Sequence, residues 1–115
     1  MSSSTSTSRK EFLCIIPDYP GSVAKRMEVR PKHLEEIMPL VQDGSVVLGG
    51  GMFDAHPSED ASEPPSFNGS AMIVLAESAE HVRRVMAADV YARAGVWDVE
   101  KASVIPFKSA VREAL

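Results

Sequence analysis

The sequence predicts an α+β fold of the ferredoxin-like type, with a four-stranded antiparallel sheet and the order β-α-β-β-α-β. Three observations support this prediction. Four short apolar runs typical of strands are combined in this order with two amphipathic helical patterns. The length of 115 residues fits one domain. No internal repeat and no linker divides the chain into smaller units.

The first strand and the first helix are indicated by an apolar run and an apolar stripe. Glu11 to Ile16 is a nearly continuous apolar run stopped by Pro17, which indicates a strand buried on both faces. Residues 22–29 are expected to form one irregular helical turn. Pro31 stands where a helix begins, and Gly44 is placed to end it. The apolar stripe of this helix consists of Leu34, Ile37, Met38 and Val41.

The middle of the chain predicts two successive strands. Val46 to Met52 reads as a strand whose three glycines suggest a bulge or a close approach to the backbone. Asp54 to Phe67 is polar, acidic and rich in proline, which predicts a loop. Asn68-Gly69 is a turn signal. Ser70 to Ala76 then reads as the third strand.

The last third of the chain predicts a helix, a helical turn and a strand. Ser78 is a typical N-cap residue. Tyr91 to Gly95 is expected to form a further helical turn, and Val99 to Ile105 the last strand, closed by Pro106. The tail to Leu115 is compatible with a short helix. The apolar side of the second helix consists of Val82, Val85 and Met86.

Composition excludes several kinds of partner. A net charge of −4 and a pI of about 5.3 argue against nucleic acid, which requires clustered basic residues. No apolar run approaches the roughly 18 residues of a membrane span. The lone Cys14 lies in an apolar run and predicts a core residue in a reducing compartment. Residues 1–9 resemble a disordered tail rather than a secretory signal, so we expect one cytoplasmic domain over residues 10–115.

The sheet is expected to need a partner. Two helices cover only one face of a four-stranded sheet, yet the first and third strands are apolar on both faces. A second copy of the same sheet is the simplest cover for the other face. The sequence therefore predicts a homodimer that packs sheet against sheet.

Two side chains are candidates for chemistry. Asp89 falls seven residues after Val82, on the apolar stripe, where a carboxylate is costly unless it is paired. Alternatively, it caps the helical turn that follows. His33 lies at the border of the first apolar stripe, a position that is also common for structural or solvated histidines. Both helices lie on one face of the sheet, so the two side chains are able to meet, and a carboxylate partner holds one tautomer of a histidine ring.

The remaining polar clusters are weaker candidates. The basic run Lys25, Arg26, Arg30 and Lys32 is read as surface charge, although Arg30 lies one turn from His33 and is placed to hold an anionic group. No motif for a serine nucleophile, a dinucleotide or a metal site is present, so no cofactor or metal is expected. A solvated acidic loop, not a metal cluster, is the interpretation of Asp54, His56, Glu59 and Asp60.

An ordered set of motifs resembles the YciI-like (YCII-related) family from Glu11 to Val111. The resemblance implies a dimeric α+β barrel and an active site built from His33 and Asp89. One departure is Val90, which stands where the family typically has proline. A second is the long acidic loop 54–67. The motifs are KRMEVRPKHL (25–34), LGGGM (48–52), NGSAMIV (68–74), ADVYARAGVWD (88–98) and VIPFK (104–108).

Some members of this family resemble lyases or dehydrohalogenases of aromatic compounds, and related barrels include isomerases. We therefore expect a cofactor-independent lyase or isomerase in which His33 is the acid or base and Asp89 orients it. The substrate would be a small cyclic or aromatic metabolite. The alternative is a non-catalytic dimeric protein that binds a small molecule or assists a pathway. The residues expected to contact the substrate are Arg30, Ser70, Gly50, Met52 and Tyr91.

Overall fold

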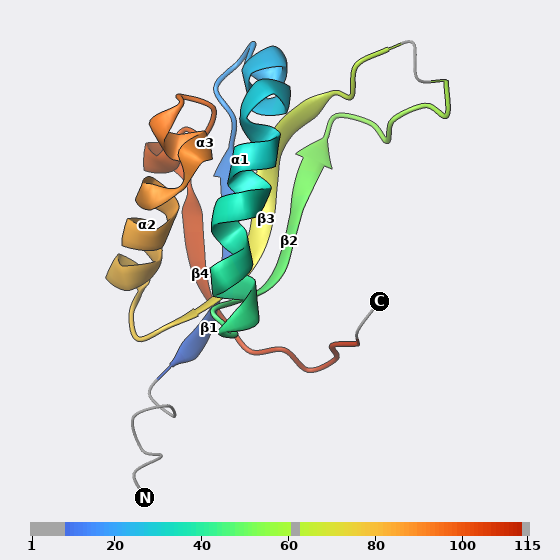
Figure 1. Ribbon diagram of the computed structural model, residues 1–115. Helices are drawn as coiled ribbons and strands as arrows, with labels where there is room; N and C mark the ends of the chain where they lie inside the picture. The colour runs from blue at the N-terminus through green and yellow to red at the C-terminus, as the bar shows by residue number, and fades with distance from the viewer. Residues whose placement is uncertain (1–8, 61–62, 114–115) are drawn as a thin grey trace, which may run out of the picture.

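The computed structural model describes residues 9–60 and 63–113. Four antiparallel strands form one sheet in the order β2-β3-β1-β4, and Figure 1 shows the helices gathered on one side of it. The predicted ferredoxin-like order is confirmed. The strands are β1 (Lys10–Pro17), β2 (Val46–Phe53), β3 (Phe67–Ala76) and β4 (Ser103–Phe107). The helices are α1 (Val23–Gln42), α2 (Ala79–Ala88), α3 (Val90–Arg93) and the 3-10 turn η2 (Val99–Lys101).

The core lies between the helices and the sheet. Every second residue of β1 is buried, and Cys14 is fully buried as a free thiol, in agreement with its prediction as a core residue. Burial raises the pKa of this thiol to about 11, so the thiol is protonated and unreactive at neutral pH. The largest fully buried side chains are Trp97, Ile16, Met86, Val74, Val82, Val96 and Cys14.

Helix α1 begins eight residues earlier than predicted. It starts at Val23 and contains Pro31 in its interior, so Pro31 does not mark the start. The expected irregular turn over residues 22–29 is instead regular helix. The side chain of Arg26 in this segment is buried and bound to Asp18, which anchors the first turns to the rest of the protein. The helix ends as predicted before Gly44, which has a φ of +82°.

Strand β3 begins before its predicted start. Asn68 and Gly69 lie inside the strand rather than in a turn, and Gly69 pairs with Pro17. A Cβ atom on Gly69 would lie 2.5 Å from the carbonyl oxygen of Ile16, so only glycine permits this close approach of β1 and β3.

The last strand is shifted toward the C-terminus. Val99–Lys101 forms a 3-10 turn instead of the start of the strand, and β4 runs over Ser103–Phe107. Pro106 lies within β4 instead of closing it. β4 is an edge strand, which is the place in a sheet where a proline is tolerated. No helix follows in residues 108–113, while residues 114–115 of the expected tail helix lie outside the described part.

The face of the sheet away from the helices carries a row of apolar side chains. Leu13 pairs with Ile73 on one side and with Ile105 on the other, and Ile73 pairs with Leu48. In this single chain Leu13 is only half-buried, so β1 is not fully buried on both faces as the sequence suggested. The row leaves two large side chains exposed, because Leu48 is 48% and Ile105 is 42% exposed.

None of the helices in the ranges 9–60 and 63–113 is both long enough and apolar enough to cross a membrane. The expected disordered tail falls mainly on residues 1–8, which lie outside the described part.

Candidate active site

A groove of about 470 Å³ lies between α1 and strands β2 and β3, a size within the range of small-molecule pockets. Its helix side includes Arg30 and His33, and its sheet side includes Gly49 and Ser70. Trp97 also lines the groove. The lining contains arginine and histidine but no aspartate or glutamate among the described residues. The groove therefore favours an uncharged or anionic ligand.

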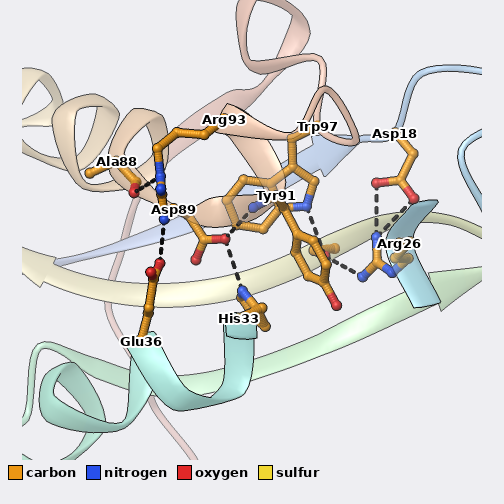
Figure 2. Close-up of polar contacts among 10 residues, drawn as sticks. Asp18, Arg26, His33, Glu36, Ala88, Asp89, Tyr91, Arg93 and Trp97 are labelled. Carbon is orange, nitrogen blue, oxygen red and sulfur yellow. Dashed lines mark hydrogen bonds and ion pairs between the residues drawn. The ribbon is translucent and has the colours of Figure 1, made fainter. Parts of the chain in front are cut away.

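His33 and Asp89 meet at this groove. Nδ1 of His33 lies 2.9 Å from Oδ1 of Asp89, and the two side chains are only 13% and 11% exposed. Asp89 reaches this position because α2 ends at Ala88 and Asp89 then caps α3, where its Oδ1 accepts a hydrogen bond from the backbone N–H of Tyr91 at 2.8 Å. Figure 2 shows Asp89 between the two donors. Both interpretations of Asp89 made from the sequence, capping and pairing, apply together.

The contacts of Asp89 decide the tautomer of His33. An ionised carboxylate has no proton to donate, so at 2.9 Å the Nδ1 atom of His33 is the donor. In the neutral ring Nε2 then carries no proton and can accept, and among the described residues no group donates to it. A histidine held in this way has its basic nitrogen available to a ligand in the groove.

Two aromatic rings hold the imidazole in place. The ring of Tyr91 stacks on His33 with 4.1 Å between centroids and an interplanar angle of 18°, while Trp97 meets His33 edge-on at 6.0 Å. Tyr91 is 2% exposed and does not line the groove, so it supports His33 rather than contacting a ligand there. Burial raises the pKa of the Tyr91 hydroxyl, which opposes its ionisation.

Arg26 forms a second polar cluster beside this pair. Its NH1 donates to both carboxylate oxygens of Asp18 at 2.8 Å, and its NH2 donates to Ser70 Oγ at 2.6 Å. The guanidinium also lies 4.6 Å from the ring centre of Phe67 and 4.7 Å from that of Tyr91. Arg26 is 3% exposed, so its interpretation as surface charge is wrong. Figure 2 shows the ion pair of Arg26 and Asp18 beside the pair of His33 and Asp89.

The glycines of β2 have different surroundings. A Cβ atom on Gly49 or Gly50 would meet nothing within 4 Å, so both leave open space. A Cβ atom on Gly51 would collide with the ring of Phe67. Gly51 thus permits Phe67 to lie against Arg26, and all three glycines line the groove. Met52 does not line the groove, and its terminal methyl group lies against Gly69.

Arg30 is exposed and lines the groove, and its predicted contact with an anionic group stays a prediction. Among the described residues, no carboxylate forms an ion pair with it within 4 Å. Its charge is available to a ligand. In the same part of the chain, no group of three or more histidine, cysteine, aspartate or glutamate side chains is arranged to bind a metal ion.

Sequence reasoning missed Arg26, Asp18 and Trp97. Arg26 lies seven residues before His33, so one continuous helix places both on the same face. The interpretation of Pro31 as the helix start concealed this spacing. The contact of Trp97 with Ser70 joins residues that are 27 positions apart and leaves no local pattern.

Known proteins resemble this chain over most of its length. A family model described as the YCII-related domain matches residues 11–108. Fusaric acid biosynthesis protein 2 of Gibberella fujikuroi is 39% identical over 103 residues, which cover 90% of this chain and 97% of that protein. Protein YciI of Escherichia coli O6:H1 is 38% identical over 99 residues, which cover 84% of this chain and 95% of that protein.

A solved structure has the same fold. It is 5-chloro-2-hydroxyhydroquinone dehydrochlorinase from Burkholderia phenoliruptrix AC1100 in complex with 2,5-dihydroxybenzoquinone. The similarity has a TM-score of 0.69 and a sequence identity of 28%, and it covers 85% of this chain and 93% of that one.

Proposed function

The chain belongs to the YCII-related family, and we propose that it is a cofactor-independent enzyme that acts on a small cyclic or aromatic metabolite by acid–base chemistry. The observation that carries the proposal is the 2.9 Å contact of His33 Nδ1 with Asp89 at a groove of ligand size. The dehydrochlorinase fold of the solved relative supports a lyase-type reaction.

The proposed chemistry begins at Nε2 of His33. This nitrogen takes a proton from an acidic C–H or O–H group of the substrate. The electron pair left behind moves to a ring oxygen or expels a leaving group. Asp89 accepts from Nδ1–H and stabilises the imidazolium that forms. His33 then returns the proton to product or solvent.

The groove supports a planar ring substrate that carries acidic or ionised oxygens. The open space at Gly49 and Gly50 accommodates a ring, and the exposed guanidinium of Arg30 is placed to bind an anionic oxygen. The solved relative binds 2,5-dihydroxybenzoquinone, a ring that bears acidic hydroxyl groups. Hydroxylated quinones and hydroquinones are therefore the first substrates to screen.

Replacement of His33 tests the proposal. We expect His33→Gln to lower turnover of an identified ring substrate by about 10²-fold or more, because a positioned general base contributes about that much. His56→Gln is the matched control, since His56 is exposed in the loop after β2. Full turnover in a folded His33→Gln protein would overturn the proposal. Binding of ring compounds without any turnover in the wild type would support the accessory role instead.

We also propose that the protein is a homodimer that packs through the outer face of the sheet. The apolar row of Leu48, Ile73, Leu13 and Ile105 supports this assembly, because no helix of the described residues covers that face. Leu13→Arg, at the centre of the row, is expected to give a monomer in sedimentation experiments. Val111→Arg is the control, because Val111 is 90% exposed. A monomeric wild type at micromolar concentration would contradict the assembly.

A further inference from the structure

Ser70 is a buried hydroxyl whose acceptor capacity is already used. Its Oγ accepts a hydrogen bond from NH2 of Arg26 at 2.6 Å and another from Nε1 of Trp97 at 3.1 Å. Guanidinium and indole nitrogens only donate, and a serine oxygen accepts at most two hydrogen bonds. Both lone pairs of Ser70 Oγ are therefore occupied, and only its O–H hydrogen remains to be donated.

This hydrogen has no acceptor among the described residues. Across residues 9–60 and 63–113, the side chain of Ser70 has no hydrogen-bond partner other than Arg26 and Trp97. The tetrahedral geometry of the oxygen directs the hydrogen away from both donors, so the hydroxyl has little freedom to rotate. Ser70 is only 4% exposed, yet it lines the same groove as His33. A buried donor without a partner is costly unless a ligand supplies the acceptor.

We propose that Ser70 is a catalytic hydrogen-bond donor that binds a carbonyl or ionised hydroxyl oxygen of the ring substrate. This assignment rests on the proposed acid–base function of His33. When His33 removes the substrate proton, the electron pair moves toward the ring oxygen, and the negative charge on that oxygen increases. Ser70 donates to this oxygen and keeps its own proton. Preorganised donors of this kind stabilise a transition state more than a ground state.

The surroundings of Ser70 make it a strong and rigid donor. A cationic donor at 2.6 Å polarises the hydroxyl and strengthens the hydrogen bond that it gives. Arg26 is itself fixed by two contacts with Asp18 and by the rings of Phe67 and Tyr91. The carboxylate of Asp18 balances the charge of Arg26. Arg30 therefore supplies the unbalanced positive charge, and Ser70 supplies a hydrogen bond of fixed direction.

The hydrogen-bonding capacity of Ser70 restricts which substrates fit the groove. Ser70 accepts nothing further, so the substrate atom beside it must be an acceptor. Rings with carbonyl or ionised hydroxyl oxygens satisfy this requirement, and a neutral hydroxyl that only donates there does not. The affinity for a ring with acidic hydroxyls is therefore expected to rise as those hydroxyls ionise.

Trp97 provides a direct reporter for the test, because it is the only tryptophan and its indole N–H donates to Ser70. The experiment titrates 2,5-dihydroxybenzoquinone into the full chain while recording the indole N–H signal by NMR. In the wild type we expect saturable binding with a shift of the indole signal. Ser70→Ala is expected to weaken binding about 10- to 100-fold, the range for a hydrogen bond to a charged group, and to reduce the increase of affinity with ligand ionisation to the part that Arg30 contributes.

Two variants separate the role of the hydroxyl from structural damage. Ser70→Thr keeps the hydroxyl and is expected to keep both the affinity and its pH dependence. Ser103→Ala removes an exposed serine from β4 and is expected to change neither. Wild-type affinity in Ser70→Ala, or no response of wild-type Trp97 to the ligand, would overturn the assignment. His33→Gln separates this result from the proposed function, since it is expected to lower turnover by about 10²-fold or more and to leave the Ser70-dependent binding.

Discussion

The carboxylate of Asp89 makes two structural hydrogen bonds, and the stability that they contribute can be measured without a substrate by removing the side chain. The carboxylate caps α3 through the backbone N–H of Tyr91 and accepts from His33. A lost N-cap costs about 1 kcal/mol, and a lost hydrogen bond in a mostly buried site costs about 1 kcal/mol more. Asp89→Ala is therefore expected to lower the free energy of unfolding by about 2 kcal/mol, measured by urea denaturation.

Ser78 provides the matched control. It caps α2 by accepting from the backbone N–H of His81 and makes no second contact of the kind that Asp89 makes with His33. Ser78→Ala removes only the cap and should lower the free energy of unfolding by about 1 kcal/mol. The excess cost of Asp89→Ala over Ser78→Ala then measures the bond to His33. If the two variants are equally stable, the pairing of Asp89 with His33 has no energetic value in solution and the reasoning fails.

Asp89→Asn separates charge from shape. Asparagine caps helices about as well as aspartate, so this variant should stay within about 1 kcal/mol of the wild type. Its side chain either accepts or donates toward His33, so the preference for one tautomer weakens. Long-range ¹⁵N–¹H spectra report the tautomer directly, with His56 and His81 as internal comparisons. A wild-type His33 protonated on Nε2 in the neutral ring would contradict the assigned geometry.

Cys14 and the glycines of β2 give two independent predictions. Burial raises the pKa of the Cys14 thiol from 9.0 to about 11. The stability that the protonated thiol contributes to the folded state is therefore complete below pH 9 and is lost as the pH rises through 11. By pH 11 the loss amounts to about 2 kcal/mol, and Cys14→Ala should lack this step in urea denaturation at a series of pH values. Gly51→Ala displaces the ring of Phe67 and should cost about 1–3 kcal/mol, whereas Gly49→Ala meets open space and should cost less than about 1 kcal/mol. Equal costs for the two glycine variants would show that the contact of Phe67 with the β2 backbone is unimportant.

Much of the fold could be predicted because its signals are local. Apolar runs located the strands, and Gly44 marked the end of α1 because a left-handed residue there favours glycine. The errors arose where tertiary contacts override local preference. Pro31 lies inside α1. The helical turns before Pro31 are held by the buried contact of Arg26 with Asp18. Such a contact leaves no periodic signal in the sequence.

The candidate site was predictable only in part for the same reason. Asp89 stood out because a carboxylate on an apolar stripe requires a partner, and the topology placed His33 on the same face of the sheet. The donor–acceptor count of Ser70 depends on Arg26 and Trp97, which come from distant segments. No spacing rule connects those three residues, so a structure is needed to recognise the unpaired hydroxyl.

We expect the buried pair of Arg26 and Asp18 to add little net stability, because the cost of desolvating both charges offsets their attraction. Burial raises the pKa of the Asp18 carboxyl, and the Arg26 guanidinium opposes this rise without cancelling it. With a raised folded-state pKa, Asp18 contributes stability that is complete below its unfolded pKa of 3.8 and is lost as the pH rises through the folded value. Desolvation thus exceeds attraction, as is common for buried ion pairs.

Replacing this pair tests whether stability and binding can be separated. Arg26→Met alone leaves a buried carboxylate without a cation and should cost about 3 kcal/mol or more at neutral pH. Arg26→Met combined with Asp18→Leu removes both charges and should restore wild-type stability to within about 1 kcal/mol in urea denaturation. The double variant should nevertheless bind 2,5-dihydroxybenzoquinone more weakly, because Ser70 loses the cation that polarises its hydroxyl. A double variant that is stable and binds as well as the wild type would mean that neither folding nor the groove requires the pair.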